Sequence, residues 1–194
     1  MANSNRPVQA KVLKDILARE SRIEVRVIDP TQSEQLEQII DLFEDWHQES
    51  VYSLVPFSRK RLAEVVYDLQ KNKHSGLLLA IFDKHTKDRS IRGRKLSHDA
   101  SIVGVLAARL GPMLFSDAMT AYVEHWYIHP QYRNTTAAVR SLTAFRIWGV
   151  KNKAQFCVLP TATGARMKQT DLLLRKLGYQ LAGGTYITKL KYND

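Results

Sequence analysis

The strongest constraint on the fold is the stretch Glu124–Phe145, in which a strand pattern passes through a short turn into a helix pattern. Residues 122–128 are rich in aromatic and β-branched side chains, which is typical of a strand, and His129-Pro130 ends it because proline donates no backbone hydrogen bond. A polar turn and a helix over 136–151 follow, with apolar residues mainly on one side: Val139, Leu142, Phe145, Ile147 and Val150. A turn that leads into a helix start presents N–H groups and a positive dipole end, which predicts an anion site, above all for phosphate.

The same residues resemble the acyl-coenzyme A loop of the GCN5-related N-acetyltransferase (GNAT) family. That family carries Arg/Gln-x-x-Gly-x-Gly/Ala after a V-x-P-x-Y-R segment, and this chain has I-H-P-Q-Y-R followed by N-T-T-A-A. Arg133 and Ala138 match the ends of the motif, whereas Thr136 replaces a glycine and offers a hydroxyl to phosphate instead. The resemblance implies acetyl-CoA as co-substrate, bound by Tyr127, Ile128, Arg133, Asn134, Thr135, Thr136, Ala137, Ala138 and Val139. The alternative is an ordinary strand–loop–helix with a solvated arginine.

The remaining patterns follow the element order of the same family, β-α-α-β-β-β-α-β-α-β. We expect strands at 23–28, 76–83, 101–110, 122–128, 155–159 and 180–190, and helices at 33–47, 58–71, 136–151 and 167–177. Gly104 inside a strand predicts a bulge or a close backbone approach. Gly111-Pro112 and Phe115–Asp117 predict connections between strands, and Lys84–Ala100 predicts a long loop. The fold class is therefore α+β, a single-domain GNAT (acyl-CoA N-acyltransferase) fold whose mixed central sheet is flanked by helices.

Two further segments extend the resemblance along the chain. Residues 46–57 resemble an H-x-E-S-x-Y…P-F loop of bacteriophage and prophage members, as do Phe115–Asp117 and the helix start Ala137–Arg140. The segment L-R-K-L-G-Y, residues 174–179, is similar to the family's Y-E-K-L-G-F. Residues 1–22 precede the resemblance and are expected to be an extension with a short amphipathic helix within 11–19, while 23–194 form the GNAT-like domain.

The resemblance also implies roles for side chains outside the loop. A general base must take a proton from the amine, and Glu124 is the candidate. Period-two alternation puts it on the side of Trp126 and Ile128, where burial would raise its pKa; the alternative is a surface glutamate. His125 would then point to the opposite face in a structural role. The acceptor is expected to contact His47, Glu49 and Tyr52, although these residues also fit plain helix-end polarity.

One position departs from the family in a way that affects catalysis. Many members place a tyrosine, acting as general acid, where this chain has Leu174, and leucine donates no proton. Tyr132, Tyr179 or Tyr186 could take that role, and a thiolate leaving group can also manage without an acid. Two functions therefore stay open. One is an N-acetyltransferase, phage-encoded, that acts on an amine of a small molecule or protein; the other is a catalytically degenerate protein that serves as a virion component or host-protein binder.

Charge and composition limit which binding partners and which cellular compartment are expected for the protein. The formal net charge of the 194 residues is +10, which suits an anionic cofactor, an anionic substrate or nucleic acid. The basic clusters lack interleaved aromatic residues, so solvated loops are favoured over nucleic-acid binding. The single cysteine, Cys157, excludes an intrachain disulfide and a cysteine-built metal site, and no apolar run is long enough for a membrane span. These features predict a cytoplasmic protein with no metal and no membrane partner, for which a homodimer or a virion assembly is conceivable.

Overall fold

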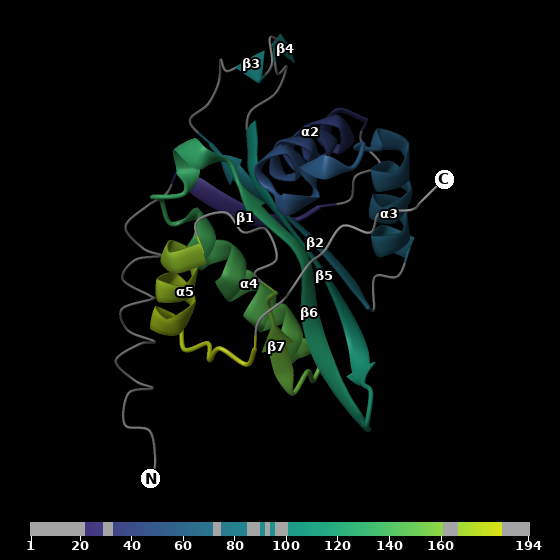
Figure 1. Ribbon diagram of the computed structural model, residues 1–194, viewed down its shortest axis with the longest axis vertical. Coiled ribbons are helices and arrows are strands. Elements are labelled where there is room, and N and C mark those ends of the chain that lie inside the picture. The colour runs from purple at the N-terminus through teal and green to yellow at the C-terminus, as the bar shows by residue number, and fades with distance from the viewer. Residues whose placement is uncertain are drawn as a thin grey trace, which may run out of the picture.

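A computed structural model describes residues 22–28, 33–71, 75–84, 90–91, 94–95, 101–160 and 167–183 of the chain. The helix predicted within 11–19 and residues 184–190 of the predicted last strand lie outside these ranges, and residues 180–183 adopt no regular structure. Within the described part, a mixed sheet lies between two layers of helices (Figure 1). This is the layer arrangement that the element order predicts.

Five strands make the sheet: β1 (Ile23–Val27), β2 (Gly76–Asp83), β5 (Ser101–Met113), β6 (Ser116–Ile128) and β7 (Phe156–Val158). They lie in the order β1-β2-β5-β6-β7. The first four are antiparallel neighbours, and β7 pairs with β6 in parallel. The stretch predicted as one long loop contains a small antiparallel ladder of its own, between β3 (Ser90–Ile91) and β4 (Arg94–Lys95).

The helices cover the two faces of this sheet in pairs (Figure 1). They are α2 (Ser33–Glu49), α3 (Arg59–Lys71), α4 (Ala137–Lys151) and α5 (Met167–Lys176), with short 3₁₀ helices η1 (Val51–Leu54) and η2 (Pro130–Tyr132). A first cluster of buried side chains joins α2 and α3 to the sheet, and a second joins α4 and α5 to the opposite face. No helix in the described ranges is long and apolar enough to cross a bilayer.

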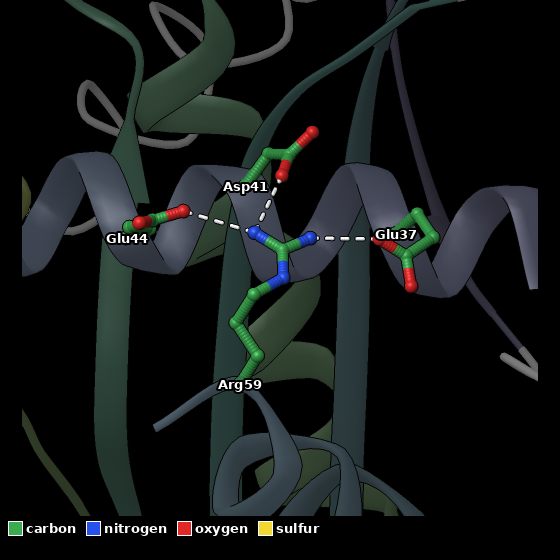
Figure 2. Close-up of polar contacts among 4 residues, drawn as sticks. All are labelled: Glu37, Asp41, Glu44 and Arg59. Atoms are coloured by element: carbon green, nitrogen blue, oxygen red, sulfur yellow. Dashed lines mark hydrogen bonds and ion pairs between the residues drawn. The ribbon is translucent and has the colours of Figure 1, made fainter. Parts of the chain in front are cut away.

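A charge cluster fixes the start of α3 against α2. Three carboxylates of α2 share one face because they are spaced three and four residues apart. Arg59 reaches all three, at 2.7 Å from Glu37 and 2.9 Å from both Asp41 and Glu44 (Figure 2). The cluster joins the two helices. Ser58 caps α3 by accepting a hydrogen bond from the N–H of Arg61.

The central hairpin is longer than its sequence pattern predicts. Strands β5 and β6 each span 13 residues and turn at Leu114-Phe115. The connection predicted at Gly111-Pro112 is therefore wrong, and of the one predicted at Phe115–Asp117 only Phe115 lies in the turn. Proline is tolerated inside β5 because the pairing with β2 ends at Arg109, and beyond that point β5 pairs with β6 alone among the described strands. A missing N–H on the open side costs no ladder hydrogen bond.

Gly104 confirms both features expected of it. The β2–β5 register shifts between Ile81 and Phe82, next to the glycine. A Cβ at position 104 would lie 2.8 Å from the Ile81 Cδ1 atom and 2.9 Å from the carbonyl oxygen of Tyr127. The glycine therefore lets β5 approach β6 closely beside the end of β6.

The buried face of α4 differs from the predicted one. Ile147 and Val150 are 64% and 76% exposed, so their assignment to the packed side was wrong. The buried stripe is instead made of Ala137, Ala138, Ser141, Leu142, Phe145 and Gly149. Small side chains alternate with large ones there, which brings the helix close to the sheet: a Cβ on Gly149 would lie 3.0 Å from the Cys157 sulfur.

Candidate functional site

Strands β6 and β7 begin side by side and then separate. Their pairing covers Thr120 to Tyr122 on β6 and Phe156 to Val158 on β7, after which β6 continues to Ile128. A cavity of about 320 Å³ lies at this gap. Its lining is Trp46, Glu49, Val123–Ile128, Arg133, Asn134, Ala138, Leu159, Pro160, Met167, Gln169, Thr170 and Leu173. The strand that ends at Ile128 therefore lies beside the strand that follows it in the chain and parts from it towards its C-terminal end.

A bulge at Glu124 reorganises the cavity-facing part of β6. Ala107 pairs with His125 and Ala108 pairs with Val123, so Glu124 is an extra residue without a partner on β5. The bulge resets the alternation of side chains: Val123 packs with Trp126 on the α4 side, and Tyr127 packs on the α2 side. The period-two argument, which assumed an unbroken strand, therefore does not fix the direction of Glu124.

The surroundings of Glu124 are polar. Its Oε1 atom accepts a hydrogen bond from the Nε of Arg109 at 2.8 Å, and its side chain is 34% exposed. Glu124 is therefore not buried among apolar groups, as its expected role had assumed. Glu124 nevertheless lines the cavity, as its candidate role requires.

The turn before α4 is held by its own hydroxyl groups. The Thr135 hydroxyl donates to the carbonyl of Tyr132 at 2.7 Å and accepts from the N–H of Ala137 at 3.2 Å. The Thr136 hydroxyl accepts from the Nε of Arg140 at 3.2 Å. Thr136 adopts φ −72°, which any L-residue adopts freely, so this position has no backbone need for glycine. Its hydroxyl already takes part in the helix start.

Glu49 and Arg133 join the two walls of the cavity. Oε1 of Glu49 accepts from the hydroxyl of Tyr127 at 2.8 Å, and Oε2 accepts from Arg133 at 2.6 Å. The Nε of Arg133 donates to the carbonyl of Ile128 at 2.8 Å. Burial, reinforced by the contact with Glu49, raises the pKa of Tyr127, so its hydroxyl stays protonated at neutral pH. These contacts tie the end of α2 to the turn that precedes α4.

Comparison with known proteins identifies the fold. No protein-family model and no curated protein matches the chain. Solved structures do match: AAC(6')-Iy in complex with a CoA-containing bisubstrate analog has a TM-score of 0.62 at 11% identity, over 89% of this chain and 100% of that one. The chain has the GNAT fold. A GNAT family acetyltransferase from Staphylococcus aureus (TM-score 0.59, 15% identity, 87% and 99% covered) and glucosamine-6-phosphate N-acetyltransferase from Arabidopsis thaliana (0.55, 10%, 89% and 99%) share it.

Within this GNAT fold, the cavity brings together some of the expected site residues and not others. Glu124, Glu49, Tyr127, Ile128, Arg133, Asn134 and Ala138 line it. Thr135, Thr136, Ala137, Val139, His47 and Tyr52 are not among the lining residues. Ala137 is fully buried against the core, and Tyr52 stacks on Trp46, with ring centres 5.9 Å apart. Tyr52 therefore contacts Trp46, which lines the cavity, but does not line the cavity itself.

Of the three tyrosines considered as a substitute acid, the two in the described residues, Tyr132 and Tyr179, do not line the cavity. Leu174 itself is 8% exposed and belongs to the core beneath α5. Tyr132 donates its hydroxyl to the buried Asp83 at 2.9 Å. Burial raises the pKa of Tyr179 to about 12, and this residue is absent from the cavity lining. Tyr186 lies outside the described residues.

The sequence patterns missed the wall that α5 provides. Met167, Gln169, Thr170 and Leu173 line the cavity. The helix itself was expected, but residue spacing says nothing about which strand gap a helix covers. Trp46 was also missed as a lining residue, because its position fits an ordinary apolar helix face equally well.

His125 is expected to make the folding stability of the protein depend on pH. Its ring packs edge-on against Phe43 and Trp46, at 5.2 and 4.9 Å between centres, and burial lowers its pKa, opposed by the charge of Glu124. A histidine with a lowered folded-state pKa contributes its stability in full above the unfolded value of about 6.5, and the contribution is lost as the pH falls through the folded value. We expect His125→Phe to gain stability relative to the wild type between pH 7 and pH 5. Urea unfolding at both pH values tests this, and an unchanged difference would refute it.

Proposed function

We propose that this chain is an N-acetyltransferase that moves an acetyl group from acetyl-CoA to an amine. The observation that carries the proposal is the cavity, which opens where β6 leaves β7 and ends at the start of α4. One end offers a helix N-terminus and a guanidinium, which suit phosphates. The lining also offers two carboxylates, those of Glu124 and of Glu49, the latter paired with this guanidinium, and carboxylates suit an ammonium group.

The residues present fit acetyl-CoA. Arg133 and Asn134 would face the pyrophosphate, together with the N–H groups of the first turn of α4. Ala138, which lines the cavity with a single methyl group, leaves room for the phosphates to approach the helix. Beyond Tyr122, the edge of β6 has no β7 partner in the described chain, so its backbone groups are available to the amide groups of the pantetheine arm.

The acceptor side favours a small amine in its charged form. The carboxylates of Glu49 and Glu124 attract an ammonium group, and the ring of Trp46 adds an apolar, electron-rich surface. The structural relatives include an enzyme named for glucosamine 6-phosphate and one bound to an acetylneamine analog, and both names denote amino compounds. An amine of a small molecule is therefore the acceptor that we propose, and a protein amine is the second choice.

The chemistry requires the attacking nitrogen to be a free amine. An ammonium must first lose a proton; its nitrogen then bonds to the thioester carbon, the carbon–sulfur bond breaks, and the thiolate of CoA leaves. Glu124 is the group placed to take the proton, and Arg109 holds its carboxylate at the bulge. With leucine at position 174, the thiolate would leave without a tyrosine acid.

Glu124→Gln separates catalysis from binding. The variant keeps the shape of the side chain but removes the base, so turnover should fall roughly a hundredfold or more. Affinity for CoA should stay nearly the same, because the pyrophosphate end of the cavity is untouched. A steady-state assay with a panel of primary amines measures the first quantity, and calorimetry with CoA measures the second. Full turnover in the variant would exclude Glu124 as the base.

Calorimetry of the wild type with acetyl-CoA and with CoA tests the proposal as a whole. Binding of both, together with acetylation of an amine in the panel, supports it. Binding without turnover favours a GNAT-fold protein that has lost catalysis, for which Leu174 is the motivating feature. A bacteriophage origin remains a hypothesis that rests on the resemblance of residues 46–57.

A further inference from the structure

The ion pair between Glu49 and Arg133 connects the acceptor side of the cavity to the phosphate side. Glu49 is the last residue of α2, and Arg133 follows η2 in the turn before α4. Their side chains are 33% and 20% exposed, so the pair is accessible from the cavity and is not sealed in the core. A partly exposed pair of this kind contributes little stability, which lets another anion compete for the arginine.

The position of Glu49 has no local explanation. The negative end of a helix dipole lies at the C-terminus, where a carboxylate is disfavoured. Both oxygens of Glu49 are instead engaged across the cavity, by the hydroxyl of Tyr127 and by Arg133. The carboxylate therefore stays there because of these two partners and not because of its own helix.

The guanidinium of Arg133 can exchange one hydrogen-bond acceptor for another while its position stays nearly the same. Its Nε is fixed on the carbonyl of Ile128 at 2.8 Å, and its guanidinium lies 5.3 Å from the ring centre of Tyr127. These contacts hold the plane of the group at the mouth of the turn. The NH2 end, which now binds Glu49, is the kind of donor that binds phosphate oxygens equally well.

We propose that Glu49 occupies Arg133 in place of a cofactor phosphate, and that phosphate binding releases the Glu49 carboxylate to hold the acceptor's ammonium group. The inference rests on the proposed function and adds an order to it. Before the exchange, each of the two lining carboxylates is paired with an arginine, Glu49 with Arg133 and Glu124 with Arg109. After the exchange, the Glu49 carboxylate is no longer neutralised by Arg133 and can pair with the acceptor's ammonium group, so the bound cofactor strengthens the binding of a primary ammonium.

Glu49→Gln tests the exchange, because it should tighten the binding of CoA and at the same time raise the KM for the acceptor amine. The amide still accepts a hydrogen bond from Tyr127 but no longer competes as an anion, so calorimetry should show CoA binding tightened about threefold to fivefold. The gain should shrink at high salt, since salt screens an exposed pair. For the amine that the wild type acetylates, KM should rise at least tenfold, because the ammonium loses a carboxylate.

The matched control is Glu37→Gln on the same helix. Glu37 is also an exposed, arginine-paired glutamate, but its partner is Arg59, in the separate cluster of Figure 2. This variant should leave both CoA affinity and KM unchanged. In an Arg133→Gln background, Glu49→Gln should no longer tighten CoA binding.

The outcomes separate this inference from the proposed function. Wild-type protein that binds no CoA overturns the proposed function, and the exchange with it. Wild-type protein that binds CoA, with Glu49→Gln binding it equally or more weakly, overturns the exchange alone and makes Glu49 a support for the turn. Tighter CoA binding combined with an unchanged KM overturns the acceptor role of Glu49. Thermal unfolding of each variant confirms that the fold is retained.

Discussion

Replacing Ala138 by glutamate is expected to abolish binding of CoA. Ala138 lies in the first turn of α4, is 7% exposed and lines the cavity. A glutamate there would fill the space that the phosphates are proposed to use and would place a negative charge against them. At about 4 Å and an effective dielectric constant of about 20, such a pair repels by roughly 4 kcal/mol, or about a thousandfold in affinity.

The matched variant Ala138→Gln separates charge from volume. Glutamine occupies nearly the same space without the charge, so it should weaken binding less than glutamate does. Thr136→Gly should preserve or tighten binding, because Thr136 is not a lining residue and its backbone conformation does not depend on its side chain. If Ala138→Glu folds and binds CoA as the wild type does, the cofactor site is elsewhere or absent, and Glu124 loses its proposed role.

The second large effect is expected from Arg22→Met. Arg22 pairs through two nitrogens with Asp83, at 2.8 and 2.5 Å, and the Asp83 side chain is fully buried at the end of β2. Removing one partner of a buried pair typically costs 3–5 kcal/mol, because the other charge is left uncompensated. Arg22 is itself 47% exposed, which lets water reach its position, so we expect a loss of about 3 kcal/mol in unfolding free energy.

Arg26→Met is the control for this prediction. Arg26 forms an equally short pair with Glu24, but both side chains are exposed, at 53% and 36%. Urea unfolding should show a change of about 1 kcal/mol or less for this variant. Equal losses from the two variants would contradict the role assigned to the burial of Asp83.

The pair between Arg22 and Asp83 also bears on the predicted domain boundary between residues 22 and 23. A chain that begins at residue 23 is expected to fold, because the core elements start with Ile23, which is 1% exposed. It should nevertheless be less stable than a chain that begins at residue 22, by about the cost of Arg22→Met. Unfolding at room temperature of the chain that begins at residue 23 would show that the boundary is wrong.

Local patterns were sufficient for most helices and strands. The end of α5 shows why: Gly178 has φ 85°, and the N–H of Tyr179 reaches the carbonyl of Leu174, which is the stop that a Lys-Leu-Gly sequence predicts. The strand Gly76–Asp83 was predicted to the residue, since an unbroken apolar run between polar ends fits a central strand alone. In these places, chain stiffness, hydrogen bonding and apolar periodicity act within a few residues of one another.

Tertiary structure decided the features that depend on a neighbour. Pro112 lies within a strand because, among the described strands, β5 has only β6 as a neighbour there, a fact that no local pattern contains. Phe145 is buried while Ile147 is exposed, because the sheet meets α4 along a stripe of small residues. The bulge at Glu124 arises from the pairing of two strands, so a period-two reading of β6 alone could not detect it.

The candidate site likewise has some features that follow from the local sequence and others that follow only from the tertiary structure. By itself, the sequence determined that a strand, a turn and a helix start would meet at Arg133 and Ala138, because proline, polar turn residues and an apolar period act locally. Only the folded chain decided what surrounds them. The sheet order placed Glu49, 84 residues away along the chain, against Arg133, and it gave the threonine hydroxyls to the helix start instead of the cavity. Electrostatic and hydrogen-bond partners are set by distance in space, and residue spacing does not encode that distance.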